Sequence, residues 1–444
     1  MGICTKFQPM GYQPTNQEDE EQHSKFKQIE FIQHNYGVGY CLLDRDNVVW
    51  IFGEAFTNGS SGYVFRYNNN ISNTTPTRFF RNVKKLCKQY GTTADGHIMF
   101  IGTDDKLYYY GQPTSITGTS NSYTNRCSTP IEMLSNVKDA WSYSTYFSGA
   151  GGVTETQTHY ALTKSGVLYA CGYNGDKRFG NGQTTSSDTW VQVLDNVEWF
   201  KIVETGNTPI LVAKKSGGIY IANYSISTEV GTISGSKTYD AFTLATTVSI
   251  DLSSNLNGVK DVISRLINLP YLYYDTSDLS SATTIYKTAL CLIKDDMLLA
   301  DIGFGFARVF DTSTGFSGCK EITPNNTSGA GFSFSDGTNI KTYWNTSGTI
   351  STVTNNDGIK KLYEFDGNIV AYITRNNDYY AFIYGVNSKF TKFAENVDFM
   401  NYSYPNYCYV TLDNDVYYGG LAVYTPYSNT KMPDFVDTNT YWQN

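Results

Sequence analysis

Short apolar runs alternate with polar turns along almost the whole chain, and the clearest example lies at residues 159–182. There an apolar run reaches a Ser165-Gly166 turn, and a second run, Val167-Leu168-Tyr169, follows it. Two short β-prone runs joined by a two-residue turn predict an antiparallel hairpin. The next residues are punctuated by glycine, which indicates tight turns in which a side chain would clash. This stretch therefore predicts one hairpin followed by a compact loop.

The same pattern recurs along the chain in weaker form. An Asn-Val or Gly-Val step leads into a polar or aromatic stretch, then an apolar run, a polar turn and a run rich in Tyr and Leu that often ends at Gly. The copies centre on residues 41–53, 99–111, 159–182, 211–223, 290–303, 332–344, 373–385 and 410–420. Repeats spaced by about 40 to 80 residues indicate a propeller or a solenoid.

A closed propeller is the stronger interpretation of these repeats, and a stacked β-solenoid is the weaker one. One small antiparallel sheet cannot bury both of its faces, whereas sheets packed around an axis bury them and protect their edges. Helical patterns are scarce, and Tyr, Phe and Gly are abundant. We therefore expect an all-β chain that forms a single propeller of seven or eight four-stranded blades with loop insertions.

The pattern also divides the chain into segments. Residues 1–24 are polar and end in the run Glu18-Asp19-Glu20-Glu21, which predicts an extended acidic arm. Residues 25–420 carry the repeats, with insertions at 224–257 and 270–287 where binding function is expected. Residues 421–444 are expected to supply a closing strand and a tail.

The net charge and the cysteines limit the classes of partner and the compartment that fit this chain. The formal net charge of −8 argues against a protein that binds a phosphate backbone, so the cluster of Lys84, Lys85 and Lys88 is interpreted as a solvated blade edge. The eight cysteines contain no C-x-x-C pair, and four of them lie inside apolar runs, which favours reduced thiols and assembly inside a cell. No apolar run is long enough to span a membrane, and no signal-peptide core is visible, so we expect neither membrane insertion nor nucleic acid binding.

Residues 159–182 resemble the repeat of the regulator of chromosome condensation family, which has the form A-L-T-x-D-G-x-V-Y-x-W-G-x-N-x-x-G-Q-L-G-x-G. The residues in step with it are Ala161, Leu162, Thr163, Gly166, Leu168, Tyr169, Gly172, Asn174, Gly180 and Gly182. The departures are Ser165 for Asp, Cys171 for Trp, and Lys177-Arg178-Phe179 for Gly-Gln-Leu. The resemblance implies a propeller, usually of seven blades, but no single function, because the family includes exchange factors for a small GTPase, ubiquitin-ligase modules and plain interaction domains.

Candidate chemistry is sparse. The four histidines have no metal-ligand spacing, and no nucleophile elbow or dinucleotide-binding motif is present, so we expect no catalytic residue, no metal and no cofactor. Asp44 to Asn47 and Asp104-Asp105 fall at hairpin turns, where turn geometry explains them better than calcium binding. Tyr271, Tyr273 and Tyr274, at the start of the second insertion, are the candidate binding residues, although a strand with alternating core and surface positions explains them equally well.

Three functions fit these observations. The first is a non-catalytic interaction propeller within a virion, such as a phage tail, fibre or decoration protein with structural or receptor-binding work. It would be assembled in the cytoplasm and would bind protein partners, or a receptor or glycan on the host surface. The second is a cytoplasmic regulator that binds a small GTPase or another signalling partner, and the third is a carbohydrate-binding surface propeller.

Overall fold

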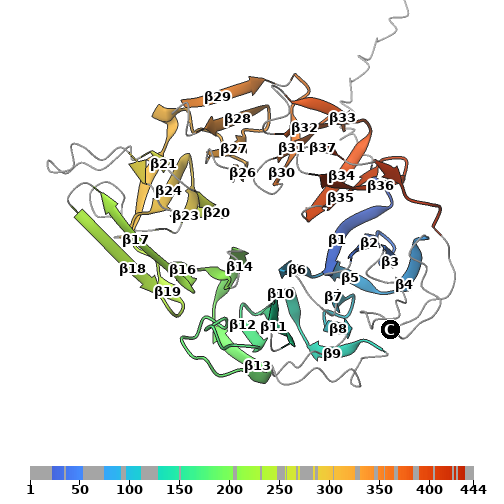
Figure 1. The fold of residues 1–444 in the computed structure, drawn as a ribbon, viewed down its shortest axis with the longest axis horizontal. Helices are drawn as coiled ribbons and strands as arrows, with labels where there is room; N and C mark the ends of the chain where they lie inside the picture. Colours follow the sequence, from blue (N-terminus) through green and yellow to red (C-terminus); the bar gives the residue numbers. More distant parts are fainter. Residues whose placement is uncertain are drawn as a thin grey trace, which may run out of the picture.

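Small antiparallel sheets surround an open centre (Figure 1). The structure is a computed structural model. It describes residues 23–34, 37–53, 75–91, 97–111, 129–149, 152–203, 208–230, 233–247, 256, 258–266, 269–270, 284–285, 289–303, 305–325, 331–344, 349–354, 356–364, 369–383, 390–403, 406–422, 425–426 and 429–435. Within these residues the sheets form eight blades of four strands each, numbered here in chain order.

The first four blades use residues 26–244. Blade 1 consists of β1 (Phe26–His34), β2 (Gly37–Asp44), β3 (Val49–Gly53) and β4 (Thr77–Phe80). Blade 2 consists of β5 (Val83–Leu86), β7 (His97–Gly102), β8 (Leu107–Gly111) and β9 (Ile131–Leu134). Blade 3 consists of β10 (Val137–Gly149), β11 (Gly152–Thr163), β12 (Leu168–Gly172) and β13 (Ser187–Leu194). Blade 4 consists of β14 (Val197–Val203), β15 (Ile210–Lys215), β16 (Gly218–Ala222) and β19 (Thr243–Leu244).

The other four blades use residues 259–431. Blade 5 consists of β20 (Val259–Leu266), β23 (Ala289–Lys294), β24 (Met297–Asp301) and β25 (Phe306–Phe310). Blade 6 consists of β26 (Glu321–Asn325), β27 (Gly331–Ser335), β28 (Asn339–Trp344) and β29 (Thr349–Thr354). Blade 7 consists of β30 (Ile359–Glu364), β31 (Ile369–Thr374), β32 (Tyr379–Ile383) and β33 (Thr391–Ala394). Blade 8 consists of β34 (Val397–Ser403), β35 (Asn406–Thr411), β36 (Val416–Ala422) and β38 (Thr430–Lys431).

A few short elements lie outside this plan. They are β6 (Lys88–Gly91), the pair β17 (Tyr224–Val230) and β18 (Ile233–Tyr239), the pair β21 (Leu269–Pro270) and β22 (Thr284–Ile285), β37 (Thr425–Pro426) and the 3-10 helix η2 (Thr312–Thr314). The first predicted insertion, 224–257, therefore contains a two-stranded ribbon and the fourth strand of blade 4. The C-terminal tail adds β38 to blade 8, beside β36.

The prediction of an all-β propeller is confirmed, and the described residues form the larger of the two blade numbers that the sequence left open. Each repeat copy supplies the second and third strands of one blade, for example β2 and β3 for 41–53 and β35 and β36 for 410–420. The Asn-Val steps mark the start of the innermost strand of the next blade.

Those steps link neighbouring blades through their backbones. Asn82, Asn136, Asn196 and Asn396 all adopt the left-handed conformation, with φ between 53° and 62°, which asparagine tolerates better than most residues. The valine that follows donates its N–H to the hairpin turn of the preceding blade, as Val137 does to the Asp105 carbonyl at 2.8 Å. The local turn chemistry of the repeat thus also sets the spacing between blades.

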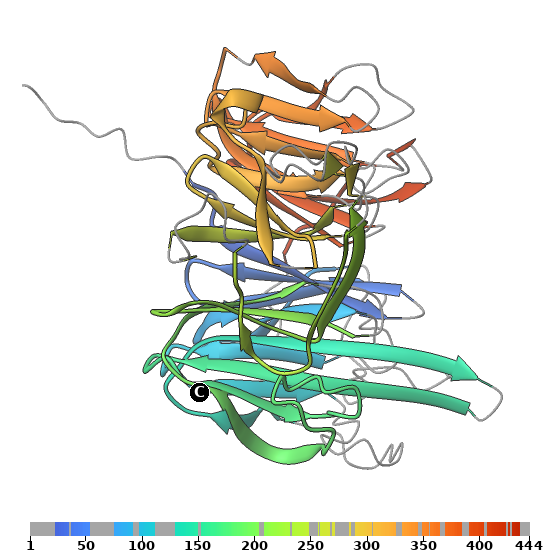
Figure 2. The same cartoon turned by 90° about the vertical axis from the view of Figure 1, so that its left-hand side faces the viewer.

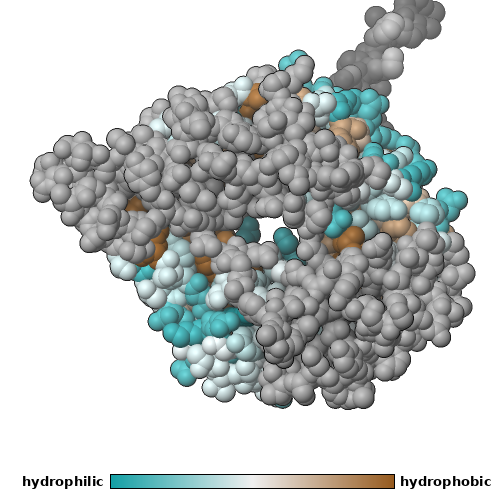
Figure 3. Space-filling model, in the orientation of Figure 1, coloured by the Kyte–Doolittle hydropathy of each residue, from teal (hydrophilic) through white to brown (hydrophobic). Residues whose placement is uncertain are grey.

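The core is divided among the seams between blades, since each seam is filled by its own apolar cluster or shares one with the next seam. A blade therefore buries both of its faces, as a closed ring requires. The space-filling view shows that an opening remains at the centre of the ring (Figure 3).

Candidate functional site

The inner strand of blade 2 departs from the pattern of the ring. β5 pairs with β7, but after Cys87 the chain crosses to blade 3, where β6 pairs in parallel with β10 from Trp141 to Ser144. Gly91 permits this close approach, because its φ is +76° and a Cβ there would lie 1.9 Å from the Ser144 carbonyl oxygen. Blades 2 and 3 are therefore joined by a strand that leaves its own sheet.

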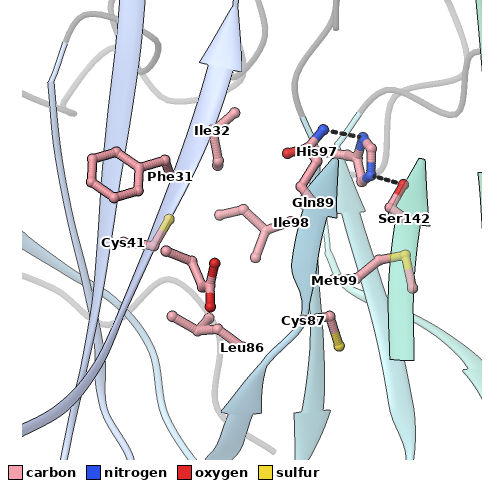
Figure 4. A pocket seen from close by; sticks show the side chains of 11 residues that line it. Phe31, Ile32, Cys41, Leu86, Cys87, Gln89, His97, Ile98, Met99 and Ser142 are labelled. Carbon is pink, nitrogen blue, oxygen red and sulfur yellow. Dashed lines mark hydrogen bonds between the residues drawn. The ribbon is translucent and has the colours of Figure 1, made fainter. Parts of the chain in front are cut away.

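The crossover leaves a small pocket beside β7, at the junction of blades 1, 2 and 3 (Figure 4). Its wall is largely apolar, with polar groups from four residues, and it has room for about one water molecule. The lining residues are Glu30, Phe31, Ile32, Cys41, Leu86, Cys87, Gln89, His97, Ile98, Met99 and Ser142.

One pair in this pocket has the spacing of a nucleophile and its base. Ser142 Oγ lies 2.8 Å from His97 Nε2, and Gln89 Nε2 lies 3.5 Å from His97 Nδ1. Both Ser142 and His97 are only 2% exposed. Burial, with a smaller effect of His159, holds the pKa of His97 well below its usual value, so the ring is neutral. A pair this enclosed, beside a pocket of this size, cannot receive a substrate, and its hydrogen bond joins blade 2 to blade 3.

The same seam contains further buried polar groups. The His97 ring stacks on Tyr109, and His159 meets both rings edge to face, with centroid distances of 5.4 and 5.6 Å. Burial lowers the pKa of His159 to about 4. Among the described residues, His159 Nδ1 and Ser144 Oγ have no hydrogen-bond partner. The polar seam therefore couples the packing of two blades to the protonation state of two histidines.

A long two-stranded ribbon extends from this seam. β10 and β11 have 13 and 12 residues, and their pairing runs without a shift from Asp139↔Leu162 to Gly149↔Gly152. Their outer neighbours stop earlier, because β6 ends opposite Ser144 and β12 ends opposite Thr158. Beyond these points no other described strand pairs with the ribbon, and Figure 2 shows it extending past the strands of the other blades. We call residues 145–149 and 152–157 the β10–β11 ribbon.

A buried arginine holds the base of this ribbon. Thr145 and Thr156 form a cross-strand hydrogen bond of 2.8 Å, and the Arg178 guanidinium donates to both hydroxyls at 2.9 Å. Arg178 is fully buried between the rings of Tyr143 and Tyr173, whose centroids lie 5.2 and 4.9 Å from its Cζ. Its ion pair with the half-exposed Asp176 measures 3.2 Å.

Arg178 belongs to the loop that follows β12, and the same loop is shaped by Asn174. The buried Asn174 amide donates to the Gln183 carbonyl and accepts from the Phe179 N–H. The glycine-rich stretch that dominates the sequence is therefore a structural loop. Its departure from the family pattern at Lys177-Arg178-Phe179 supplies the clamp for the ribbon.

The second ribbon, β17–β18, is packed against blade 5. Tyr224 Oη accepts from the Leu290 N–H at 3.1 Å, and Tyr239 Oη donates to Asp301 Oδ2 at 3.3 Å. Burial raises the pKa of the Asp301 carboxyl, although hydrogen bonds from Gly303 and Tyr239 oppose the shift. The β17–β18 ribbon thus connects blade 4 to blade 5 through side-chain hydrogen bonds.

The predicted binding residues Tyr271, Tyr273 and Tyr274 lie outside the described residues, so the binding platform there stays a prediction. In the basic cluster, Lys84 and Lys85 form ion pairs of 2.6 Å with Asp105 and Asp139. The six cysteines that the structure describes are free thiols, and five of them are buried.

Sequence reasoning did not predict the β10–β11 ribbon, although a signal was present. Residues 141–144 alternate between an aromatic residue and serine, and threonine occupies every second position from 154 to 158, on either side of the sequence Gly-Ala-Gly-Gly at 149–152. Such alternation predicts a hairpin longer than a blade strand. The crossover of β6 had no comparable signal, because it depends on pairing between residues about 50 positions apart.

Within the described part of the chain, no group of three His, Cys, Asp or Glu side chains is placed to hold a metal ion. The same residues contain no helix that is long and apolar enough to cross a membrane.

No protein-family model matches this sequence, and no curated protein matches it either. Solved structures with a similar fold include Prp20p from Saccharomyces cerevisiae, the yeast RCC1 protein. It is 12% identical over 83% of this chain and 79% of that chain, with a TM-score of 0.40. BamB from Moraxella catarrhalis is 9% identical over 88% and 96% (TM-score 0.42), and Sqt1 from S. cerevisiae is 10% identical over 90% and 94% (TM-score 0.41). Similarity at this level concerns the fold alone.

Proposed function

We propose that this chain is a non-catalytic protein-binding propeller and that its partner docks on the β10–β11 ribbon. The observation that carries the proposal is a two-stranded ribbon that leaves the ring at a fixed point, held there by a buried arginine. A rigid, projecting element binds a partner with little loss of conformational freedom, which favours affinity.

The edges of the ribbon, which pair with no other described strand, support this role. A strand edge without a partner pairs readily with another chain, so soluble proteins usually protect it with charge, proline or a bulge. Residues 145–149, Thr-Tyr-Phe-Ser-Gly, contain neither charge nor proline, and their pairing with β11 has no bulge. The Ser142–His97 pair does not support a catalytic role, because both side chains are buried.

A pair of matched deletions tests the proposal. Tyr146 and Glu155 are register partners, so replacing residues 147–154 with Asn-Gly gives a shorter hairpin with a favourable two-residue turn. The control replaces residues 228–235 with Asn-Gly between the register partners Ser227 and Ser236 of the β17–β18 ribbon.

Complexes purified from the native source identify the partner, and binding is then measured with purified components. We expect the 147–154 deletion to weaken binding by at least roughly 100-fold and the control to bind like the unaltered chain. A chain found in no complex would overturn the interaction role. A partner that binds both deletions equally would overturn the assignment to the ribbon.

We propose a narrower placement in a virion, as a tail, fibre or decoration protein assembled in the cytoplasm. Its support is compositional: few charged residues, many Tyr, Asn, Ser and Thr, and no disulfide among the six cysteines that the structure describes. Mass spectrometry of virions purified from the source should detect peptides of this chain. Their absence from virions, with the chain present in cytoplasmic complexes, would contradict the placement.

We also propose that the blades are diverged repeats of the regulator of chromosome condensation family. The support is the motif at 159–182 together with Asn174 and the left-handed Asn-Val links. Sequences of close homologues should restore the family's Asp and Trp at the positions of Ser165 and Cys171 in several blades. Homologues that keep the hairpins without these residues would argue for an independent repeat.

A further inference from the structure

The innermost strands share a pairing irregularity whose residue has different partners in blade 8. In blades 1–5, 7 and 8 the pairing of the first and second strands shifts at the second residue of the first strand. The residues at this shift are Lys27, Lys84, Lys138, Glu198, Lys260, Lys360 and Asp398. Five are lysines, and two, Glu198 of blade 4 and Asp398 of blade 8, are carboxylates.

In three blades the lysine binds the left-handed residue at the hairpin turn of its own blade. Lys27 Nζ lies 2.6 Å from Asn47 Oδ1, Lys84 reaches Asp105 at 2.6 Å, and Lys360 reaches Asn377 at 3.1 Å. The corresponding residues of blade 8 are Asp398 and Asn414. Both bind the N-terminal segment of the chain instead.

Asp398 is almost completely enclosed by that segment. Its carboxylate is 3% exposed and accepts from the Ser24 N–H at 2.8 Å and from the Ser24 hydroxyl at 2.9 Å. His23 Nδ1 lies 3.3 Å away, and Lys360 Nζ of blade 7 lies 3.4 Å away. Asn414 Oδ1 accepts from the Lys25 N–H at 2.5 Å.

Two further contacts hold the segment from the side of blade 1 and the tail. Arg45 Nε donates to the Ser24 carbonyl at 2.7 Å. The Lys25 ammonium lies over the rings of Phe26, Trp50 and Phe435 at 4.9, 5.7 and 4.5 Å. Side chains of both blades at this seam therefore contact residues 23–26.

The chain's topology explains why the seam between blades 8 and 1 depends on these contacts. The strands of blade 1 come from residues 26–80 and those of blade 8 from residues 397–431, so the two ends of the chain share no described blade. Every other seam joins blades that the backbone connects directly. Among the described residues, the seam between blades 8 and 1 is held by apolar packing and by hydrogen bonds that involve side chains.

From these contacts we propose that residues 23–25 form a detachable strap that closes the ring, with Asp398 and Asn414 as its binding site. The site recognises an extended Ser-Lys segment: the buried carboxylate accepts from the serine N–H and hydroxyl, and the amide oxygen accepts from the lysine N–H. Release of the strap opens one seam while the eight blades stay folded. This goes beyond the binding role proposed for the ribbon.

The charged and titratable groups that face Asp398 are His23, Lys360 and Tyr363. Burial alone would raise the pKa of the Asp398 carboxyl, but hydrogen bonds from Ser24 and His23 and the charge of Lys360 outweigh it and lower the pKa. The carboxylate's contribution is therefore present above about pH 4 and is lost as the pH falls below that value.

Hydrogen exchange on the full chain tests the strap. With Asp398→Asn we expect amides in 24–31 and 399–402 to exchange about tenfold faster, because the strap loses charge-assisted bonds, while blades 3 to 6 keep their rates. Asp105→Asn is the matched control, since Asp105 is also a carboxylate that binds side chains of two blades, Lys84 and Lys164, but lies away from the seam. Equal acceleration in all blades, or none at the seam, would overturn the proposal.

A synthetic peptide of residues 23–30 tests detachment separately. Added to the full chain carrying Ser24→Ala, it should restore at least roughly half of the lost protection in 399–402. The same peptide with Ser24→Ala should restore none. No restoration by the first peptide, or equal restoration by both, would show that the segment is a fixed part of blade 1.

Discussion

Single residues in this ring combine local turn chemistry with contacts between blades. Asn82, Asn136, Asn196 and Asn396 adopt the left-handed conformation and also start the next blade. Their role could be anticipated from the sequence, because asparagine before a β-prone run indicates a turn. The buried polar residues could not, since His97 and Ser142 are 45 positions apart and meet only once the blades are in place.

His159 should make the ring sensitive to mild acid. Its pKa in the folded chain is about 4, against about 6.5 when unfolded, so the unfolded state binds more protons between these values. We expect the free energy of unfolding to fall by roughly 3 kcal/mol between pH 6.5 and pH 4. Denaturation at several pH values measures this, and His159→Phe should flatten the curve while preserving the aromatic contacts. An unchanged curve would contradict a neutral buried imidazole.

Asp301 should behave in the opposite sense. Because burial raises its pKa, the carboxyl stabilises the fold most when protonated, and that stabilisation is lost as the pH rises above about 4. In the variant Asp301→Asn, the side-chain oxygen could accept from the Gly303 N–H while the new amide nitrogen donates to Tyr239. We therefore expect this substitution to raise the free energy of unfolding at pH 7. A loss of stability at pH 7 in a thermal melt would contradict this.

At the scale of elements, the hairpin core of each blade was predictable from the sequence. The additional strand pairings and contacts between blades were not. Period-two alternation and turn residues located the second and third strands of the blades, because both signals are local. The crossover of β6 and the clamp on the β10–β11 ribbon depend on Gly91 and Arg178, whose roles appear only when distant strands pair. Tyr271, Tyr273 and Tyr274 remain predicted binding residues.

Arg178→Met should make the β10–β11 ribbon less stable without unfolding the ring. The change removes two hydrogen bonds to Thr145 and Thr156 and the cation–π contacts with Tyr143 and Tyr173. A buried, paired charge costs about 3–5 kcal/mol when its partner is lost, whereas replacing the charge itself by an apolar chain costs less. We expect the free energy of unfolding to fall by roughly 1–3 kcal/mol. Amide exchange should accelerate in 145–157 first, and uniform acceleration would contradict a local clamp.

At the scale of the whole molecule, four of the junctions between neighbouring blades are linked in the same way. The links at Asn82, Asn136, Asn196 and Asn396 need a positive φ. Replacing any one of them with Gly should change the free energy of unfolding by less than about 0.5 kcal/mol, and replacing it with Val should lower it by about 1–2 kcal/mol. A series of Gly and Val variants at the four positions, measured by chemical denaturation, checks this, and similar values for Gly and Val would contradict the link geometry.

The ring's function depends on which of its surfaces departs from the repeat. Seven or eight blades could be predicted from the repeats, and the ring has eight within the described residues, but a repeat by definition says nothing about where it is broken. The β10–β11 ribbon and the closing strap are the two departures with the fullest set of contacts. Beyond Ser144 and Thr158 the ribbon pairs with no other described strand.

Amide hydrogen exchange of the chain, free and in complex with its purified partner, tests this account most directly. We predict that protection gained on binding is concentrated in residues 145–157, with the blade cores unchanged, because a partner strand would occupy the open edge there. Protection elsewhere on the ring, with exchange in 145–157 unaltered, would contradict the account.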